Sequence, residues 1–179
     1  MSVETVKSLL WPLSDFWTDQ TAAREVETID AEQIPQPYRD LLCHARDMTP
    51  TLETFWQDKL HLDVLARLEA RGELFRHVIL RTEDGRAAAF GAIRIRVTAF
   101  PEDARPRILE GRAPLGTILR EHDVPHRSAP TGFFRTEPNA LTRQAFGPTA
   151  AKVHYGRHNE LSGPTGLLAE VVEILPSLD

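Results

Sequence analysis

Apolar positions follow two different spacings along the chain, and the change comes near residue 58. Before that point, leucines and aromatic residues recur every three or four positions, which is typical of helices with one buried face. After it, apolar and polar residues largely alternate, which is typical of strands. The pattern therefore predicts helices first and strands afterwards. The helices expected in the first part cover residues 3–18, 38–46 and 52–58.

Two details complete the first part of the chain. Residues 19–35 are polar and acidic, so we expect a loop or a ragged helix there. Thr49 or Thr51 is expected to cap the third helix, because a hydroxyl at that point accepts from the first free backbone amides. The length predicts a single domain over residues 1–179, with residues 1–46 as a helical extension at its start.

Alternation and turn residues divide the second part into strands. Asp84-Gly85 predicts a tight hairpin turn, because glycine adopts the positive φ that such turns need, and Arg71-Gly72 predicts a weaker one. Residues 59–71 fit a strand, although the spacing of their leucines also fits a helix. The expected strands cover residues 60–66, 78–80, 90–95, 128–137, 151–161 and 166–175, the last two as a hairpin.

Short helices are expected between these strands. Residues 105–110 end at Gly111, a typical helix C-cap, and Pro114 opens a helix over residues 115–121. Residues 138–148 are expected to be a loop. The fold class predicted is α+β, with a mostly antiparallel sheet of about six strands and with N-terminal and inserted helices.

Composition excludes several classes of protein. The net charge is -5 and no dense Lys/Arg patch occurs, so nucleic acid is not expected as a partner. The single cysteine rules out an intrachain disulfide, and no apolar run approaches the roughly 18 residues of a membrane span. The N-terminus lacks the features of a secretory peptide. We expect a cytoplasmic monomer or homodimer.

Arg76 is the first candidate for a functional residue. It lies in a strand between Phe75 and the apolar residues 78–80. A buried guanidinium needs an anion, because an unpaired buried charge costs several kcal/mol, and it can hold a carboxylate through two parallel hydrogen bonds. The alternative is an edge-strand arginine in contact with water.

Glu170 is the second candidate for a functional residue. Its neighbours on both sides are apolar (Leu168, Ala169, Val171). A carboxyl group in such surroundings tends to have a raised pKa and can act as a general acid. A glutamate on the solvent face, or an ion-pair partner of Arg76, fits the sequence equally well.

Other polar residues give weaker signals. The start of the helix at Leu115 and Gly116 offers free amides, which favour an anion. No Cys/His spacing matches a metal site and no nucleotide-binding motif occurs, so neither metal nor cofactor is expected. His122 and His126 flank Pro125 and indicate a loop. The cluster Lys152, His154, Tyr155, Arg157 and His158 is basic overall; it either adds positive field near a site or forms a solvated strand face, and we favour the second.

These segments, in this order, resemble the chorismate pyruvate-lyase family, whose fold is shared with UTRA-type ligand-binding domains of bacterial regulators. The resemblance covers about residues 47–176. Asp47-Met48-Thr49 is similar to the family's opening motif, and Pro114-Leu115-Gly116 is similar to a motif that offers its leucine amide to the ligand. Glu170 lies eight residues after Ser162, as the family's catalytic glutamate follows its Ser-Gly turn.

The resemblance implies a cofactor-free lyase that converts chorismate, or a related cyclohexadienyl carboxylate, to a hydroxybenzoate and pyruvate. Arg76 would hold a carboxylate and Glu170 would be the general acid. The amides of Leu115 and Gly116, with Met48 and Thr49, would line the site.

One departure points to a second reading. Where the family carries a second arginine, this chain has Ala92, and Arg94 or Arg96 is the expected replacement. A chain without that arginine fits a non-catalytic protein of the same fold that binds a small anionic or aromatic metabolite. Both functions therefore remain as hypotheses, and so does the question of whether the protein is an enzyme.

Overall fold

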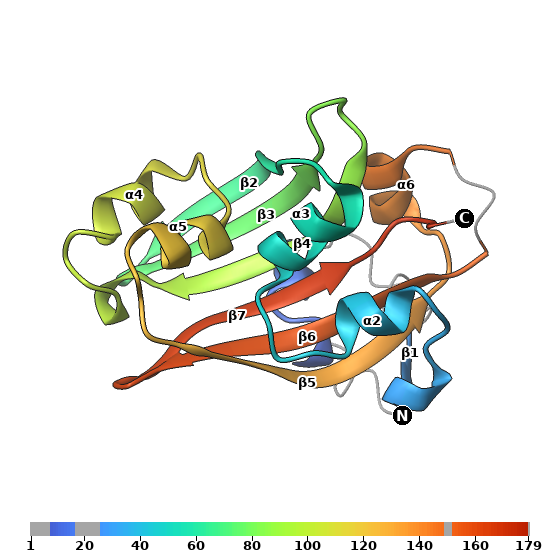
Figure 1. Ribbon diagram of the computed structural model, residues 1–179, viewed down its shortest axis with the longest axis horizontal. Helices are drawn as coiled ribbons and strands as arrows, with labels where there is room; N and C mark the ends of the chain where they lie inside the picture. The colour runs from blue at the N-terminus through green and yellow to red at the C-terminus, as the bar shows by residue number, and fades with distance from the viewer. Residues whose placement is uncertain (1–7, 17–25, 149–151, 179) are drawn as a thin grey trace.

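The computed structural model describes residues 8–16, 26–148 and 152–178. Within these ranges, seven strands form one antiparallel sheet in the order β1-β5-β6-β7-β4-β3-β2 (Figure 1). The centre of the sheet is the β6–β7–β4 group, so the C-terminal hairpin pairs with a strand from the middle of the chain. The strands are β1 (Val26–Ile29), β2 (His61–Ala70), β3 (Glu73–Arg81), β4 (Ala87–Arg96), β5 (Arg127–Thr136), β6 (His154–Gly163) and β7 (Gly166–Ile174).

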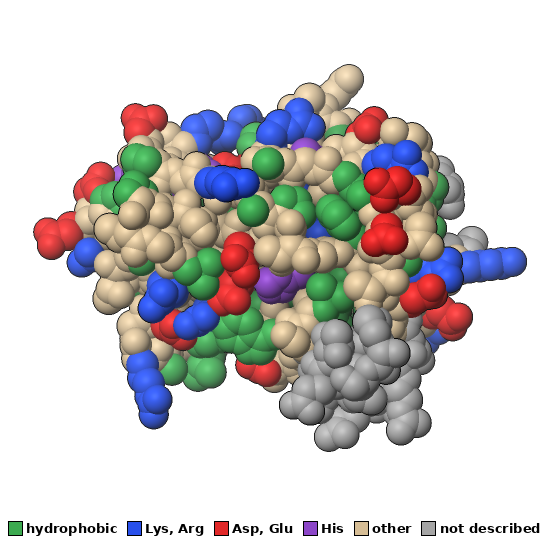
Figure 2. Space-filling view, turned by 90° about the horizontal axis from the view of Figure 1, so that it is seen from below, with side chains coloured by type: hydrophobic (Ala, Val, Ile, Leu, Met, Phe, Trp, Pro, Cys, Tyr) green, Lys and Arg blue, Asp and Glu red, His purple; other side chains and the backbone are tan. Residues whose placement is uncertain are grey.

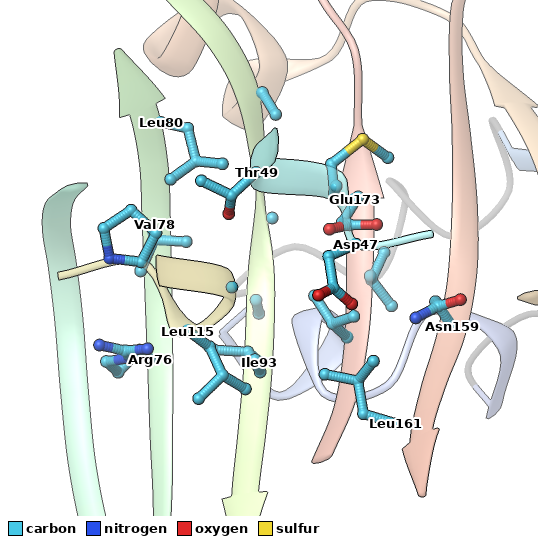
Figure 3. Close-up of a pocket in the computed structure, with 18 of the residues that line it drawn as sticks. Asp47, Thr49, Arg76, Val78, Leu80, Ile93, Leu115, Asn159, Leu161 and Glu173 are labelled. Carbon is cyan, nitrogen blue, oxygen red and sulfur yellow. The ribbon is translucent and has the colours of Figure 1, made fainter. Parts of the chain in front are cut away.

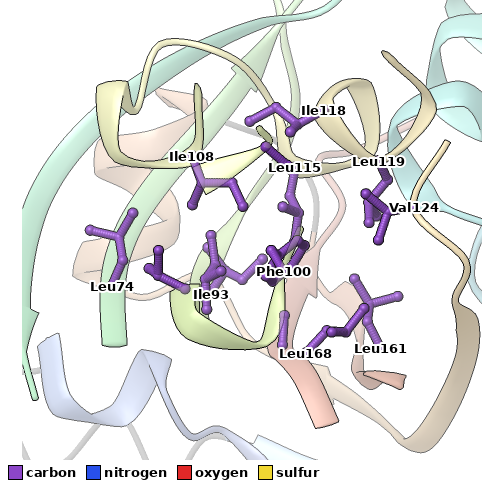
Figure 4. Close-up of a cluster of buried hydrophobic side chains, with 14 of the residues drawn as sticks. Leu74, Ile93, Phe100, Ile108, Leu115, Ile118, Leu119, Val124, Leu161 and Leu168 are labelled. Carbon is purple, nitrogen blue, oxygen red and sulfur yellow. The ribbon is translucent and has the colours of Figure 1, made fainter. Parts of the chain in front are cut away.

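Helices cover one face of this sheet, which we call the helical face (Figure 1). They pack over it through two apolar clusters, one beneath α4 and α5 (Figure 4) and one beneath α2 and α3. The helices on this face are α2 (Tyr38–Leu42), α3 (Met48–Trp56), α4 (Arg105–Glu110) and α5 (Leu115–Glu121). The described residues also form α6 (Ala140–Phe146) and the 3₁₀ turns η1 (Leu13–Phe16), η3 (Ala31–Gln33) and η4 (Val97–Ala99).

The opposite face of the sheet has its own cover. Side chains from η1 and α6 pack there against Phe90, Phe134 and Val172. The central strands are therefore buried on both faces, which makes β4 almost continuously apolar rather than alternating.

Most of the expected elements are confirmed. Within residues 59–71, His61–Ala70 form strand β2 rather than a helix, and the last two strands form the expected hairpin. Gly85 and Gly111 take the positive φ values of 86° and 72° that their turn and helix end require. The predicted α+β class is confirmed, with seven strands in the described residues where about six were expected.

Three local predictions are wrong. The expected loop 138–148 contains α6, because the Asn139 side chain accepts from the amides of Leu141 and Thr142 and so starts a helix. Residues 26–29, within the expected loop, form edge strand β1 against β5. Helix α3 begins at Met48 and its cap is Asp47, so neither Thr49 nor Thr51 is the cap.

The N-terminal helix expected over residues 3–18 is tested only in part. Residues 1–7 and 17–25 lie outside the described residues, and Leu13–Phe16 form a 3₁₀ turn. In the described part of the chain, no helix has the length and apolarity to cross a membrane. The face in Figure 2 carries acidic and basic side chains interspersed.

Candidate functional site

Two neighbouring rows of residues cross the helical face of the sheet. In the first row, Arg76 of β3 lies opposite Ile93 of β4, and the row continues through Val171 of β7 to Asn159 of β6. Positions two residues along a strand share its face. The second row therefore lies beside the first on the same face, and it runs through Val78, Gly91, Glu173 and Arg157.

A cavity lies between these rows and the starts of α3 and α5 (Figure 3). Its volume is about 670 Å³ when the part open to solvent is included. Most of its wall is apolar. The aliphatic side chains in that wall include Met48, Val78, Leu80, Ile93, Leu115 and Leu161.

Arg76 lines this cavity without an acidic partner. Its side chain is 1% exposed, its Nε has no hydrogen-bond partner, and Nη1 donates to the carbonyl of Ala113 at 3.3 Å. Among the described residues, no carboxylate lies within ion-pair distance of it. Burial, together with the positive charge of Arg67, lowers the pKa of Arg76 to about 10. The guanidinium is therefore a cation at pH 7 whose charge the surrounding protein does not balance.

Arg157 lines the same cavity and, as is usual for a buried arginine, it has an acidic partner. It is also 1% exposed, but its Nε donates to Glu173 at 2.7 Å and its Nη1 donates to the carbonyls of Leu42 and His44, each at 3.1 Å. Two arginines with equal burial thus differ in one respect. Arg157 has its anion within the protein, whereas Arg76 has none among the residues that the structure describes.

The starts of α3 and α5 meet above the sheet. Gly116 lies so close to α3 that a Cβ on it would lie 3.0 Å from Oγ1 of Thr49, so the glycine permits this close approach. Asp47, the cap of α3, accepts from Nε2 of His126 at 2.9 Å, and the carbonyl of Val124 lies 2.8 Å from Nδ1 of the same ring. Burial disfavours the imidazolium, but these two acceptors outweigh it and raise the pKa of His126.

The structure brings together five of the residues expected to form the site. Met48, Thr49, Arg76, Leu115 and Gly116 all line the cavity. In this arrangement an arginine lies beside the starts of two helices, of which the sequence suggested only the one at Leu115. The solvent-exposed alternative for Arg76 is wrong, because its side chain is buried.

The structure does not bring Glu170 or Arg94 to the cavity. Both belong to the row Phe75–Arg94–Glu170–Glu160, which faces the opposite side of the sheet. There Nη1 of Arg94 donates to Glu170 at 2.7 Å, Nη2 donates to Glu73, and the guanidinium lies 5.1 Å from the Trp11 ring centre. Glu170 is thus an ion-pair partner, but of Arg94 rather than Arg76. Arg94 does not replace the second arginine in the cavity.

Sequence reasoning missed the polar residues of the far wall. Arg157 was expected on a solvated strand face, yet it is buried, since β6 is covered on both sides. Glu173 and Asn159 also line the cavity. The position of Glu173, three residues after Glu170 and hence on the other face of β7, was the available signal.

The antiparallel α+β fold is consistent with the UTRA and chorismate lyase-like fold that the sequence resemblance implies. No family model and no curated protein matches the sequence. Among solved structures, PhnF from Mycobacterium smegmatis is similar with a TM-score of 0.55 and 12% identity. The match covers 74% of this chain and 64% of that one, so it spans less than two thirds of PhnF.

Two further solved structures share the fold. The effector domain of PhnF matches with a TM-score of 0.55 and 13% identity over 73% of this chain and 88% of that one. Gene product SA0254 from Staphylococcus aureus matches with a TM-score of 0.55 and 6% identity, over 75% of this chain and 90% of that one. At these identities the likeness concerns the fold alone.

Proposed function

We propose that the cavity on the helical face binds a small anionic molecule and that Arg76 holds its acid group. The observation that carries this proposal is the buried guanidinium, which has no anionic partner in the described ranges 8–16, 26–148 and 152–178. Keeping an ion unpaired in the interior costs several kcal/mol. A ligand carboxylate or phosphoryl group would offset that cost with charge-assisted hydrogen bonds, which are about twice as strong as neutral ones.

The rest of the cavity suits an organic anion. Its aliphatic wall would contact a ring or a short carbon chain, and burial of that surface contributes roughly 25 cal/mol per Å². The similar PhnF structure is described as an effector domain, a description that agrees with a binding role on this fold. We therefore favour binding over turnover.

The rival function is a lyase acting on chorismate. Elimination of an enolpyruvyl ether needs a general acid beside the leaving oxygen, and Glu170 lies across the sheet from the cavity. Neither expected replacement for the second arginine lines the cavity, because Arg94 pairs with Glu170 on the opposite face and Arg96 lies 3.9 Å from Glu73. The second arginine that does line it, Arg157, is paired with Glu173. We propose that the protein releases no pyruvate from chorismate, which a coupled pyruvate assay tests directly.

Paired ligands test the binding proposal most sharply. Melting temperatures are measured with benzoate and other small carboxylates and with the matched amides, which have the same shape and no charge. The acids should stabilise the protein and the amides should not, since a ligand at 100 times its Kd contributes about 2.7 kcal/mol.

Two variants then locate the binding site. Arg76→Met should abolish the response to acids. The matched control Arg94→Gln removes a strand arginine from the opposite face, so it should lower the starting melting temperature and leave the response intact. Equal responses to acid and amide, or a response that survives in Arg76→Met, would contradict the proposal.

A further inference from the structure

The charged groups of the cavity are distributed unevenly between its two ends. Four charged side chains line it: Arg76 on the β3 side, and Asp47, Arg157 and Glu173 away from it. In the view of Figure 3, the carboxylates of Asp47 and Glu173 both lie on the β7 side of the cavity, and Arg76 lies on the β3 side. The cavity thus has a cationic end and an end rich in carboxylate oxygens.

The groups at the second end already have cationic partners. Glu173 receives a hydrogen bond from Nε of Arg157 at 2.7 Å, and Asp47 receives one from Nε2 of His126 at 2.9 Å. The two cations at this end, Arg157 and His126, are thus already paired with the two carboxylates. Carboxylate oxygens carry about four lone-pair sites, so Asp47 and Glu173 retain capacity to accept further hydrogen bonds.

The distance between the two ends sets the size of the ligand. Strand β4 separates Arg76 on β3 from Glu173 on β7, so the backbones lie two interstrand spacings apart, about 10 Å. Both side chains point to the same face, and the aliphatic wall lies between them. Arg76 and Glu173 also lie two positions apart along the strands, about 7 Å, so we expect a ligand of about one six-membered ring with a substituent at each end.

We infer that the ligand carries only one negative charge, bound at Arg76, and presents a hydrogen-bond donor such as an amino or hydroxyl group to Asp47 and Glu173. This inference rests on the proposed function and narrows it to a class: monoanions with a donor opposite the acid group. Molecules with an acid group at both ends are rejected, because the second one would face two carboxylates.

Two pairs of ligands of nearly equal shape test the inference by titration calorimetry on the wild-type protein. 4-Aminobenzoate carries a hydrogen-bond donor opposite its acid group, and 4-methylbenzoate has a methyl group at the same position. The amine should bind about tenfold more tightly, as expected for a hydrogen bond to a charged acceptor. Terephthalate and its monoamide differ in the second charge, and the diacid should bind at least about tenfold more weakly.

The variant Glu173→Gln provides a further test, because its affinity for terephthalate should rise. The substitution leaves Arg157 without its carboxylate partner, so terephthalate should bind this variant more tightly than it binds the wild type. A gain of this kind is visible only in folded protein. If the variant does not fold, the two wild-type comparisons decide.

The outcomes separate the inference from the proposed function. If all four acids bind with equal affinity, the single-charge and donor inference is wrong while anion binding at Arg76 stands. If terephthalate binds as well as its monoamide, the rejection of a second charge is wrong. If none of the acids binds, the proposed function and the inference both fail.

Discussion

Replacing Arg76 with methionine should stabilise the ligand-free protein, although it destroys the proposed binding site. The substitution removes a buried charge that has no anionic partner and puts an unbranched apolar side chain in its place. The neighbours on the same face are aliphatic, including Val78 and Leu115. Arg157→Met is the matched comparison, because Arg157 has the same 1% exposure in the same cavity.

The magnitudes follow from the partners of each arginine. An unpaired buried ion costs several kcal/mol, and the hydrogen bond from Arg76 to the carbonyl of Ala113 recovers about 1–2 kcal/mol of that. Arg76→Met should therefore gain about 1–3 kcal/mol. Arg157→Met leaves Glu173 without its partner and should cost about 3–5 kcal/mol.

Urea unfolding of the ligand-free variants at pH 7 measures both changes. The pKa of Arg76 is about 10 in the folded protein, below its ordinary value. The burial penalty is therefore fully present below pH 10 and is relieved as the pH rises through that value. If Arg76→Met destabilises the protein as much as Arg157→Met does, then Arg76 has an internal partner, and the reasoning fails.

Three further predictions test other parts of the structure. The pKa of His126 is raised, so its contribution to the free energy of unfolding is fully present below the pKa of the unfolded state and is lost as the pH rises through the folded pKa. In urea unfolding, His126→Gln should therefore cost about 1 kcal/mol at pH 5.5 and less at pH 9. A cost independent of pH would show that the pair with Asp47 is not ionic. Gly91→Ala would place a Cβ 1.8 Å from the carbonyl oxygen of Val172, so a loss of more than about 3 kcal/mol is expected in thermal unfolding, and a neutral result would mean that β4 and β7 do not approach so closely. Glu170→Gln should lower stability by about 1 kcal/mol and leave the affinity for benzoate unchanged in calorimetry, whereas lost affinity would place Glu170 at the ligand.

Much of the fold was predictable because local signals agreed with long-range packing. Asp84-Gly85 and the proline before Leu115 fix backbone angles within a few residues, so the turn and the start of α5 are confirmed. Helix α6 was missed because its cap, Asn139, lies in a stretch that otherwise resembles a loop. Strand β1 has only four residues and depends on pairing with β5, which the local sequence does not encode.

Only part of the site could be predicted from the sequence, because the direction of a side chain on a strand also depends on long-range pairing. A strand that is buried on both faces does not alternate, so the apolar neighbours of Glu170 could not show which way it points. The register places Glu170 beside Arg94 and Glu173 beside Gly91, and that register is a property of the whole sheet. The burial of Arg157 also depends on α2, whose last carbonyl it contacts.

A structure of the protein crystallised with 4-aminobenzoate tests the central claim most directly. The account predicts the ligand carboxylate within about 3 Å of the Arg76 guanidinium, on the β3 side of the cavity, with the amine directed to Asp47 and Glu173. A carboxylate bound beside Arg94 on the opposite face, or a ligand in the cavity with its acid group turned away from Arg76, would contradict it.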